Sequence, residues 1–200
     1  MATTDTKTRG LTINAALERS FGSLAKLDVQ FAEYARQVAS DYGSQADWSR
    51  EGMPEPPTPE QLESWVDQNP NSYWGMRLLA QIYLASGRPE EAKPLLEKLH
   101  ELGTATGDRG GLLEMLAKVH AKLGETEQER QRLEELVSLS GDALPALRRL
   151  ADLAQEQKNW EQVLGYSEKI LAIQPLLPGV HVVIAEAADQ LNRPKQAVAA

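Results

Sequence analysis

Apolar residues recur at three- and four-residue steps along most of the chain, which is the spacing of one face of an α-helix. Leu24, Leu27, Phe31, Tyr34 and Val38 form one such run. Strand-like alternation is missing, and the helix-favouring residues Ala, Leu, Glu, Gln and Lys dominate. The pattern predicts an all-α fold with helices near 11–21, 24–42, 59–68, 72–86, 89–103, 110–123, 126–139, 143–157, 160–173 and 178–191, and a short last helix from Pro194.

Helix-breaking residues divide the N-terminal part of the chain. Gly22-Ser23 separates the first two expected helices, with Ser23 as an N-cap. Thr58 and Gln61 are spaced for a capping box, with Pro59 at the first helical position. We therefore expect a disordered N-terminus at 1–10, a helical segment at 11–43, a Pro/Ser/Gly-rich linker at 44–58 and a capping helix at 59–70.

One frame of small and large apolar residues recurs four times downstream. Its first copy consists of Leu79, Ala80, Tyr83, Gly87, Ala92, Leu96 and Leu99. The residues at the turn position of the frame are Gly87, Gly124, Lys158 and Asn192, which we call the turn residues. They are separated by 37, 34 and 34 residues, and a three-residue insertion in the Gly-rich stretch 104–111 accounts for the longer step. This period predicts stacked helical hairpins.

The frame resembles the tetratricopeptide repeat from about Tyr73 to Ala200. The resemblance implies a right-handed α-solenoid of four repeats over 71–200, the last incomplete, behind an N-terminal helical extension. Small residues such as Ala80 then lie where antiparallel helices cross. Glu129 stands where the frame has a small residue, so we expect it to point partly to solvent, and His120 replaces an aromatic as a semi-buried packing residue.

The same resemblance implies that the first helix of each repeat lines a concave groove. The predicted groove residues are Trp74, Arg77, Gln81, Lys118, Lys122, Arg148 and Asp152. Arg77, Lys118, Lys122 and Arg148 suggest a basic strip for an acidic or C-terminal peptide. The competing interpretation is that mixed charges line this face without binding anything.

Composition narrows the function further. Lys and Arg number 21 against 29 Asp and Glu, a net charge of -8 that argues against a nucleic-acid partner. There is no cysteine, and no apolar stretch approaches the roughly 20 residues of a membrane span. The polar residues 1–10 carry no secretory signal, so the expected location is cytoplasmic, or exported if a signal lies upstream.

No motif for catalysis, cofactor binding or metal binding is expected. His100-Glu101 begins a zinc-protease motif, but position 104 is Thr instead of the second His. Neither a phosphate-binding loop nor a nucleophile elbow is present. The sequence therefore predicts a non-enzymatic scaffold that binds a protein or peptide.

A second resemblance leaves an alternative open. Residues 15–37 (AALERSFGSLAKLDVQFAEYARQ) are similar to the segment that closes the peptidase-MA-like (gluzincin) domain in some bacterial proteins. The chain would then be the non-catalytic C-terminal tail of a larger bacterial metallopeptidase. A natural start at Met1 would exclude that alternative.

The C-terminal end supports a related expectation. The fourth repeat carries apolar residues on its first helix, while its second helix begins at Pro194 and stops at Ala200. Because a repeat hides its apolar face only against a neighbour, we expect an internal fragment whose C-terminal end contacts a second copy.

Overall fold

The computed structural model describes residues 12–43, 45–104 and 111–193, and the side chains of 40–43 are excluded from that description. The predicted disordered N-terminus at 1–10, the last helix from Pro194 and the self-contact at Ala200 lie outside the described residues. The chain divides into two compact units, 1–44 and 45–200. Each unit is described by itself.

The first unit consists of two helices, α1 (Ile13–Phe21) and α2 (Leu24–Gly43). Gly22 separates them with a φ of 89°, and the Ser23 hydroxyl accepts a hydrogen bond from the Lys26 amide as the predicted N-cap. None of the side chains described in this unit is buried. Phe31 and Tyr34 are both 66% exposed, so the apolar run forms the expected helix but has no core to cover it within this unit.

The second unit opens with a segment that packs on the first repeat. From Gln45 onward, the stretch predicted as a linker is held by two backbone hydrogen bonds of 2.8 Å, from the Asp47 amide to the Asn71 carbonyl and from the Tyr73 amide to the Asp47 carbonyl. The Trp48 ring stacks on the Tyr73 ring with centroids 4.0 Å apart. This segment therefore lies against the repeats, although its composition is typical of a loop.

Helix α3 (Pro59–Gln68) begins as its sequence predicts. The Thr58 hydroxyl accepts a hydrogen bond from the Gln61 amide, and the Gln61 side chain accepts one from the Thr58 amide, which completes the capping box. Leu62 of this helix is fully buried. Its apolar face thus covers the start of the array.

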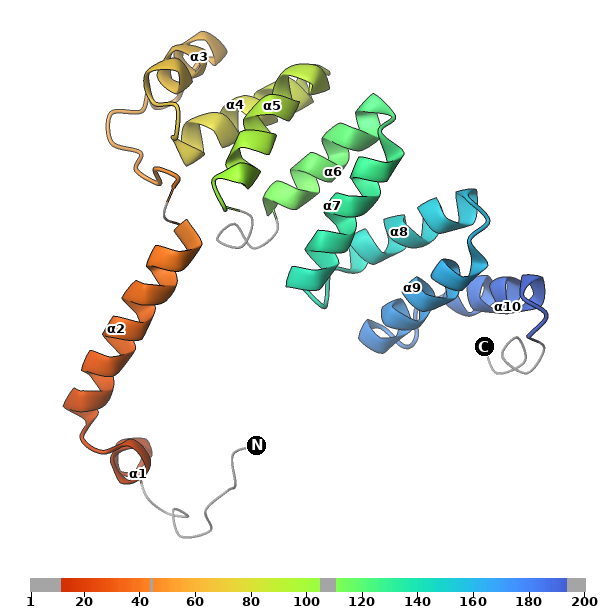
Figure 1. Cartoon of the computed structure of the whole chain (residues 1–200), viewed down its shortest axis with the longest axis horizontal. Helices are drawn as coiled ribbons and strands as arrows, with labels where there is room; N and C mark the ends of the chain where they lie inside the picture. Colours follow the sequence, from red (N-terminus) through yellow and green to blue (C-terminus); the bar gives the residue numbers. More distant parts are fainter. Residues whose placement is uncertain (1–11, 44, 105–110, 194–200) are drawn as a thin grey trace. The chain divides into compact units, whose positions relative to one another are not determined.

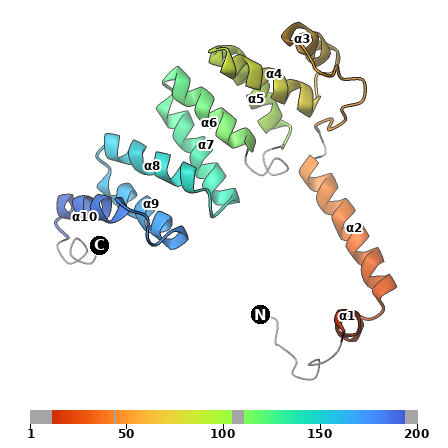
Figure 2. The ribbon, with the colours of Figure 1, turned by 180° about the vertical axis from the view of Figure 1, so that it is seen from behind.

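The remaining helices form hairpins that stack in chain order. They are α4 (Tyr73–Ala85), α5 (Pro89–Glu101), α6 (Gly111–Leu123), α7 (Thr126–Leu139), α8 (Leu144–Glu156), α9 (Trp160–Ile173) and α10 (Val180–Gln190). We call α4, α6, α8 and α10 the A helices and α5, α7 and α9 the B helices. Each helix packs on the next along the chain (Figures 1 and 2). The second unit is an all-α solenoid of the tetratricopeptide type, as the sequence predicts.

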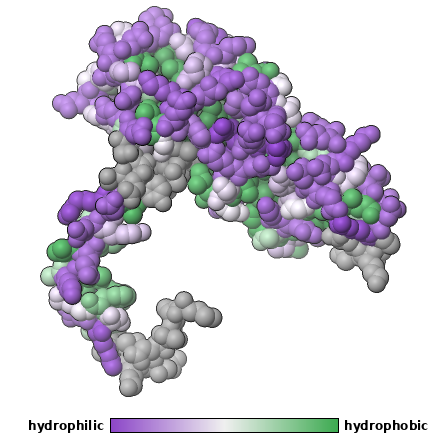
Figure 3. All heavy atoms as spheres, viewed as in Figure 1, coloured by the Kyte–Doolittle hydropathy of each residue, from purple (hydrophilic) through white to green (hydrophobic). Residues whose placement is uncertain are grey.

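The small residues of the repeat frame are buried in the array. Ala80 and Ala92 are fully buried, and Ala151 is only 8% exposed. Hydrophilic residues dominate the face of the solenoid seen in Figure 3, and hydrophobic residues show there only in patches. Burial of the apolar stripe of each helix against its neighbours holds the array together.

His120 is more deeply buried than the semi-buried packing residue expected at this position. It is 3% exposed, and its Nδ1 lies 2.6 Å from a carboxylate oxygen of Glu125, which follows the helix turn. A buried imidazole needs a hydrogen-bond partner, and Glu125 provides one. Lys93 donates to the same carboxylate at 2.8 Å and joins this turn to the preceding repeat.

The backbone confirms the repeat frame independently of packing. All four turn residues have a positive φ, which is 71° at Gly87, 72° at Gly124 and 55° at both Lys158 and Asn192. Left-handed backbone favours glycine and is uncommon for lysine. Lys158 and Asn192 adopt it because the hairpin requires the same turn in every repeat.

Lys158→Gly is expected to raise the free energy of unfolding by about 0.5–1 kcal/mol, because glycine adopts this conformation without steric strain. Urea denaturation followed by far-UV circular dichroism measures the change. The control is Gln157→Gly at the preceding residue, whose φ is -84° and which should gain nothing. An equal gain in both variants would show that the backbone conformation at 158 is not the cause.

Candidate functional site

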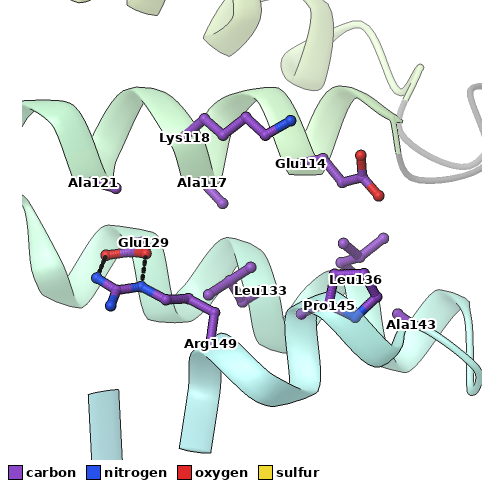
Figure 4. A pocket seen from close by; sticks show the side chains of 11 residues that line it. Glu114, Ala117, Lys118, Ala121, Glu129, Leu133, Leu136, Ala143, Pro145 and Arg149 are labelled. Atoms are coloured by element: carbon purple, nitrogen blue, oxygen red, sulfur yellow. Dashed lines mark hydrogen bonds and ion pairs between the residues drawn. The ribbon is translucent and has the colours of Figure 1, made fainter. Parts of the chain in front are cut away.

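A cleft of about 490 Å³ lies between α6 and α8, with α7 as its floor (Figure 4). We call it cleft 1. It is lined by Glu114, Ala117, Lys118 and Ala121 of α6, by Glu129, Leu133 and Leu136 of α7, and by Ala143, Pro145, Ala146 and Arg149 at and before the start of α8. Its volume is in the range of sites that hold a small ligand or several side chains.

The floor of cleft 1 is apolar and its walls are lined mostly by small residues. Leu133 and Leu136 of the floor are 6% and 4% exposed. Ala117 and Ala121 on the α6 wall leave the space between the A helices open (Figure 4). Ala146 of α8 lines the other wall. A side chain entering here would meet hydrocarbon below and charged groups at the rim.

An ion pair closes one end of cleft 1. The Arg149 guanidinium donates to the two carboxylate oxygens of Glu129 at 2.6 and 3.1 Å, and the Glu129 side chain is only 5% exposed. Hydrogen bonding to Glu129 holds the pKa of Arg149 above its usual value. The prediction that Glu129 points to solvent is therefore wrong, because Arg149 of the next repeat supplies the two N–H groups that a buried carboxylate needs.

A second cleft of about 430 Å³ lies between α8 and α10, with α9 as its floor. We call it cleft 2. It is lined by Arg148, Ala151, Asp152, Gln155, Ser167, Ile170, Leu177, Pro178, Gly179, Val180 and Val183. Ten of these eleven residues lie 34 residues after a residue that lines cleft 1. The two clefts thus occupy the same structural position in successive repeats.

The rims of the two clefts carry opposite charges at equivalent positions. Glu114 in cleft 1 corresponds to Arg148 in cleft 2, and Lys118 corresponds to Asp152. All four residues are exposed. Within the residues that the structure describes, Glu114, Lys118 and Arg148 make no side-chain hydrogen bond or ion pair. These charges are therefore available to a ligand.

The other predicted groove residues lie outside both clefts. Lys122 is exposed near the end of α6, and Gln81 is exposed on α4. Trp74 contacts the segment before α3, where the Arg50 guanidinium lies 3.6 Å from its ring centroid. The Arg77 guanidinium lies 6.0 Å from the same centroid. The N-terminal part of the predicted site is thus partly occupied by the segment that covers the first repeat.

The predicted basic strip is not continuous. The same number of residues before the turn residue of each repeat, α4 has Arg77 and α8 has Arg148. At this position α6 has the acidic Glu114. Asp152 likewise takes the position of Lys118 in the following repeat. Between α6 and α8, both positions therefore reverse their charge.

The remaining histidines are engaged with neighbouring groups. Nε2 of His100 lies 2.8 Å from Oε1 of Glu135, and Nε2 of His181 lies 3.3 Å from the Pro175 carbonyl oxygen.

Among the described residues, no three His, Asp or Glu side chains are grouped for metal binding. No helix in that part of the chain is long and apolar enough to cross a membrane.

The solved structures that this chain resembles include two crystal structures of MamA. One aligns with a TM-score of 0.57 and 18% sequence identity over 70% of this chain and 81% of that chain. The other aligns with a TM-score of 0.58 and 17% identity over 82% of this chain and 86% of that chain. These likenesses support the tetratricopeptide-type fold.

Sequence comparisons give no relative. No family model matches the chain, and no curated protein matches it. The resemblance of residues 15–37 to a gluzincin segment has no support among these matches.

Proposed function

We propose that this chain is a non-enzymatic protein-interaction module that binds an extended peptide segment across clefts 1 and 2. The observation that carries the proposal is the repetition of one cleft at one structural position in two successive repeats. A ligand that crosses the A helices meets the same arrangement twice. Two shallow clefts in line suit a chain that lies across the repeats better than a single compact ligand.

The dimensions of the clefts favour a peptide. An extended chain advances roughly 3.3 Å per residue, so two apolar side chains a few residues apart on one peptide can reach separate clefts. Leu133 and Leu136 form the floor of cleft 1, and Ile170 contributes to the floor of cleft 2. Burial of the two side chains would supply the affinity, and the rim charges would select the neighbouring residues.

Filling either cleft is expected to weaken peptide binding by at least about tenfold, because an indole would take the place of the ligand side chain. The variants are Ala121→Trp in cleft 1 and Gln155→Trp at the equivalent position of cleft 2. Both residues are exposed, so the substitutions leave the core intact. Peptides selected on the wild-type chain from a random library serve as probes, and fluorescence anisotropy measures their dissociation constants.

The control for this experiment is Ala172→Trp, which places the same side chain at an exposed position of α9 outside both clefts. It should leave affinity unchanged. If all three variants bound the selected peptides as well as the wild type, the peptide site would lie elsewhere on the chain, and clefts 1 and 2 would have no part in it.

A further inference from the structure

We infer that the peptide bound across the two clefts is bipolar, with an acidic residue facing Lys118 and a basic residue facing Asp152. The inference rests on the proposed function and adds the chemistry of the ligand. It follows from the charges at equivalent positions of the two clefts, which are opposite in sign.

The charge reverses along both rows of equivalent positions that cross α6 and α8. Toward the start of the A helices a ligand meets Glu114 and then Arg148, and in the middle of the helices it meets Lys118 and then Asp152. A ligand with two acidic residues gains attraction in one cleft and meets repulsion in the other. The same is true of a ligand with two basic residues, so only opposite charges are favourable in both clefts.

Lys118 and Asp152 are assigned as the selecting pair because of their place along the walls. Lys118 lies between Ala117 and Ala121, which border the apolar floor, at the middle of α6 (Figure 4). Asp152 has the equivalent place in α8, beside Ala151. Glu114 and Arg148 lie nearer the starts of their helices. A ligand residue next to an apolar anchor seated over Leu133 is therefore expected to face Lys118, and Asp152 has the equivalent place in cleft 2.

The ion pair at the end of cleft 1 does not change this balance. Arg149 adds a positive charge and Glu129 a negative one, and the two are hydrogen-bonded to each other. Their fields largely cancel at the distance of a ligand in the middle of the cleft. The exposed charges at the rims therefore determine which charges on a ligand are favourable.

Synthetic peptides test the inference directly. All carry two leucine anchors, and the spacing between the anchors is varied from roughly two to five residues in matched sets. They differ only in the flanking charges, which are one Glu and one Lys in both orders, two Glu, or two Lys. At low salt the better of the two bipolar peptides should bind the wild-type chain at least about fivefold more tightly than either uniform peptide. The difference should shrink as salt rises, because exposed charges are screened.

Charge reversal in the protein should switch this preference. Asp152→Lys makes the selecting pair basic in both clefts, and the peptide with two Glu should then bind best. Lys118→Glu makes the pair acidic, and the peptide with two Lys should then bind best. Glu101→Lys, which makes the same charge change as Asp152→Lys at an exposed position at the end of α5, should keep the wild-type order.

The outcomes separate this inference from the function on which it rests. Peptides that bind, lose affinity in Ala121→Trp and show the same charge order in every variant would overturn the bipolar inference alone. A wild-type preference for the peptide with two Glu would overturn it in favour of a basic strip. Binding that is indifferent to Ala121→Trp and Gln155→Trp would overturn the proposed site itself.

Discussion

Arg149→Met is expected to lower the free energy of unfolding by about 2–4 kcal/mol, a large effect for a residue whose side chain is 40% exposed. The reason lies in its partner. Glu129 is buried, and loss of the guanidinium would leave its carboxylate without the two hydrogen bonds that Arg149 donates. Because water can reach the Arg149 side of the pair, the loss is expected to be smaller than for a fully buried charge. Urea denaturation measures it.

The next repeat supplies the rescue variant. The positions equivalent to Glu129 and Arg149, 34 residues later, are occupied by Val163 and Val183. Val163 is fully buried. The double variant Glu129→Val with Arg149→Val copies this arrangement and removes both charges together, so most of the lost stability should return. A double variant as unstable as Arg149→Met would show that the pair is needed for more than neutralising a buried charge.

Ala80→Leu is expected to lower the free energy of unfolding by about 1–3 kcal/mol. Ala80 is fully buried in α4, between core residues contributed by the neighbouring helices. A leucine there must push apart helices that are already in contact, because the interior has no space for the added carbons. Thermal and urea denaturation both measure the loss.

Ala172→Leu is the matched control for Ala80→Leu, because it adds the same carbons to a helix at an exposed position. It should change stability by no more than about 0.5 kcal/mol. Equal stability of Ala80→Leu and the wild type would mean that α4 does not pack as the repeat frame requires.

The helices and the repeat frame could be predicted from the sequence alone. Apolar spacing of three and four residues predicted α4, α6 and α8 within two residues of their observed ends. Thr58 and Gln61 marked the start of α3, and they form the predicted capping box. These features depend on residues close together in the chain, so a local pattern is enough to find them. The turn at Lys158 was found by period alone, and its positive φ agrees.

The clefts and the charges at their rims depend on how distant helices pack together. Glu129 taken alone on its helix was expected at the surface, and its burial depends on Arg149, 20 residues away in the next repeat. Trp48 and Tyr73 are 25 residues apart, and their stacking places a loop-like segment on the first repeat. Likewise, Lys118 and Asp152 occupy equivalent positions of neighbouring clefts only because α6 and α8 are stacked in register. The local sequence predicts which side chains lie on each face of a helix. Which of them are buried, and which charges meet at a cleft, depends on the helix that packs beside that face. That neighbouring helix is distant in the sequence and is known only from the packing of the fold.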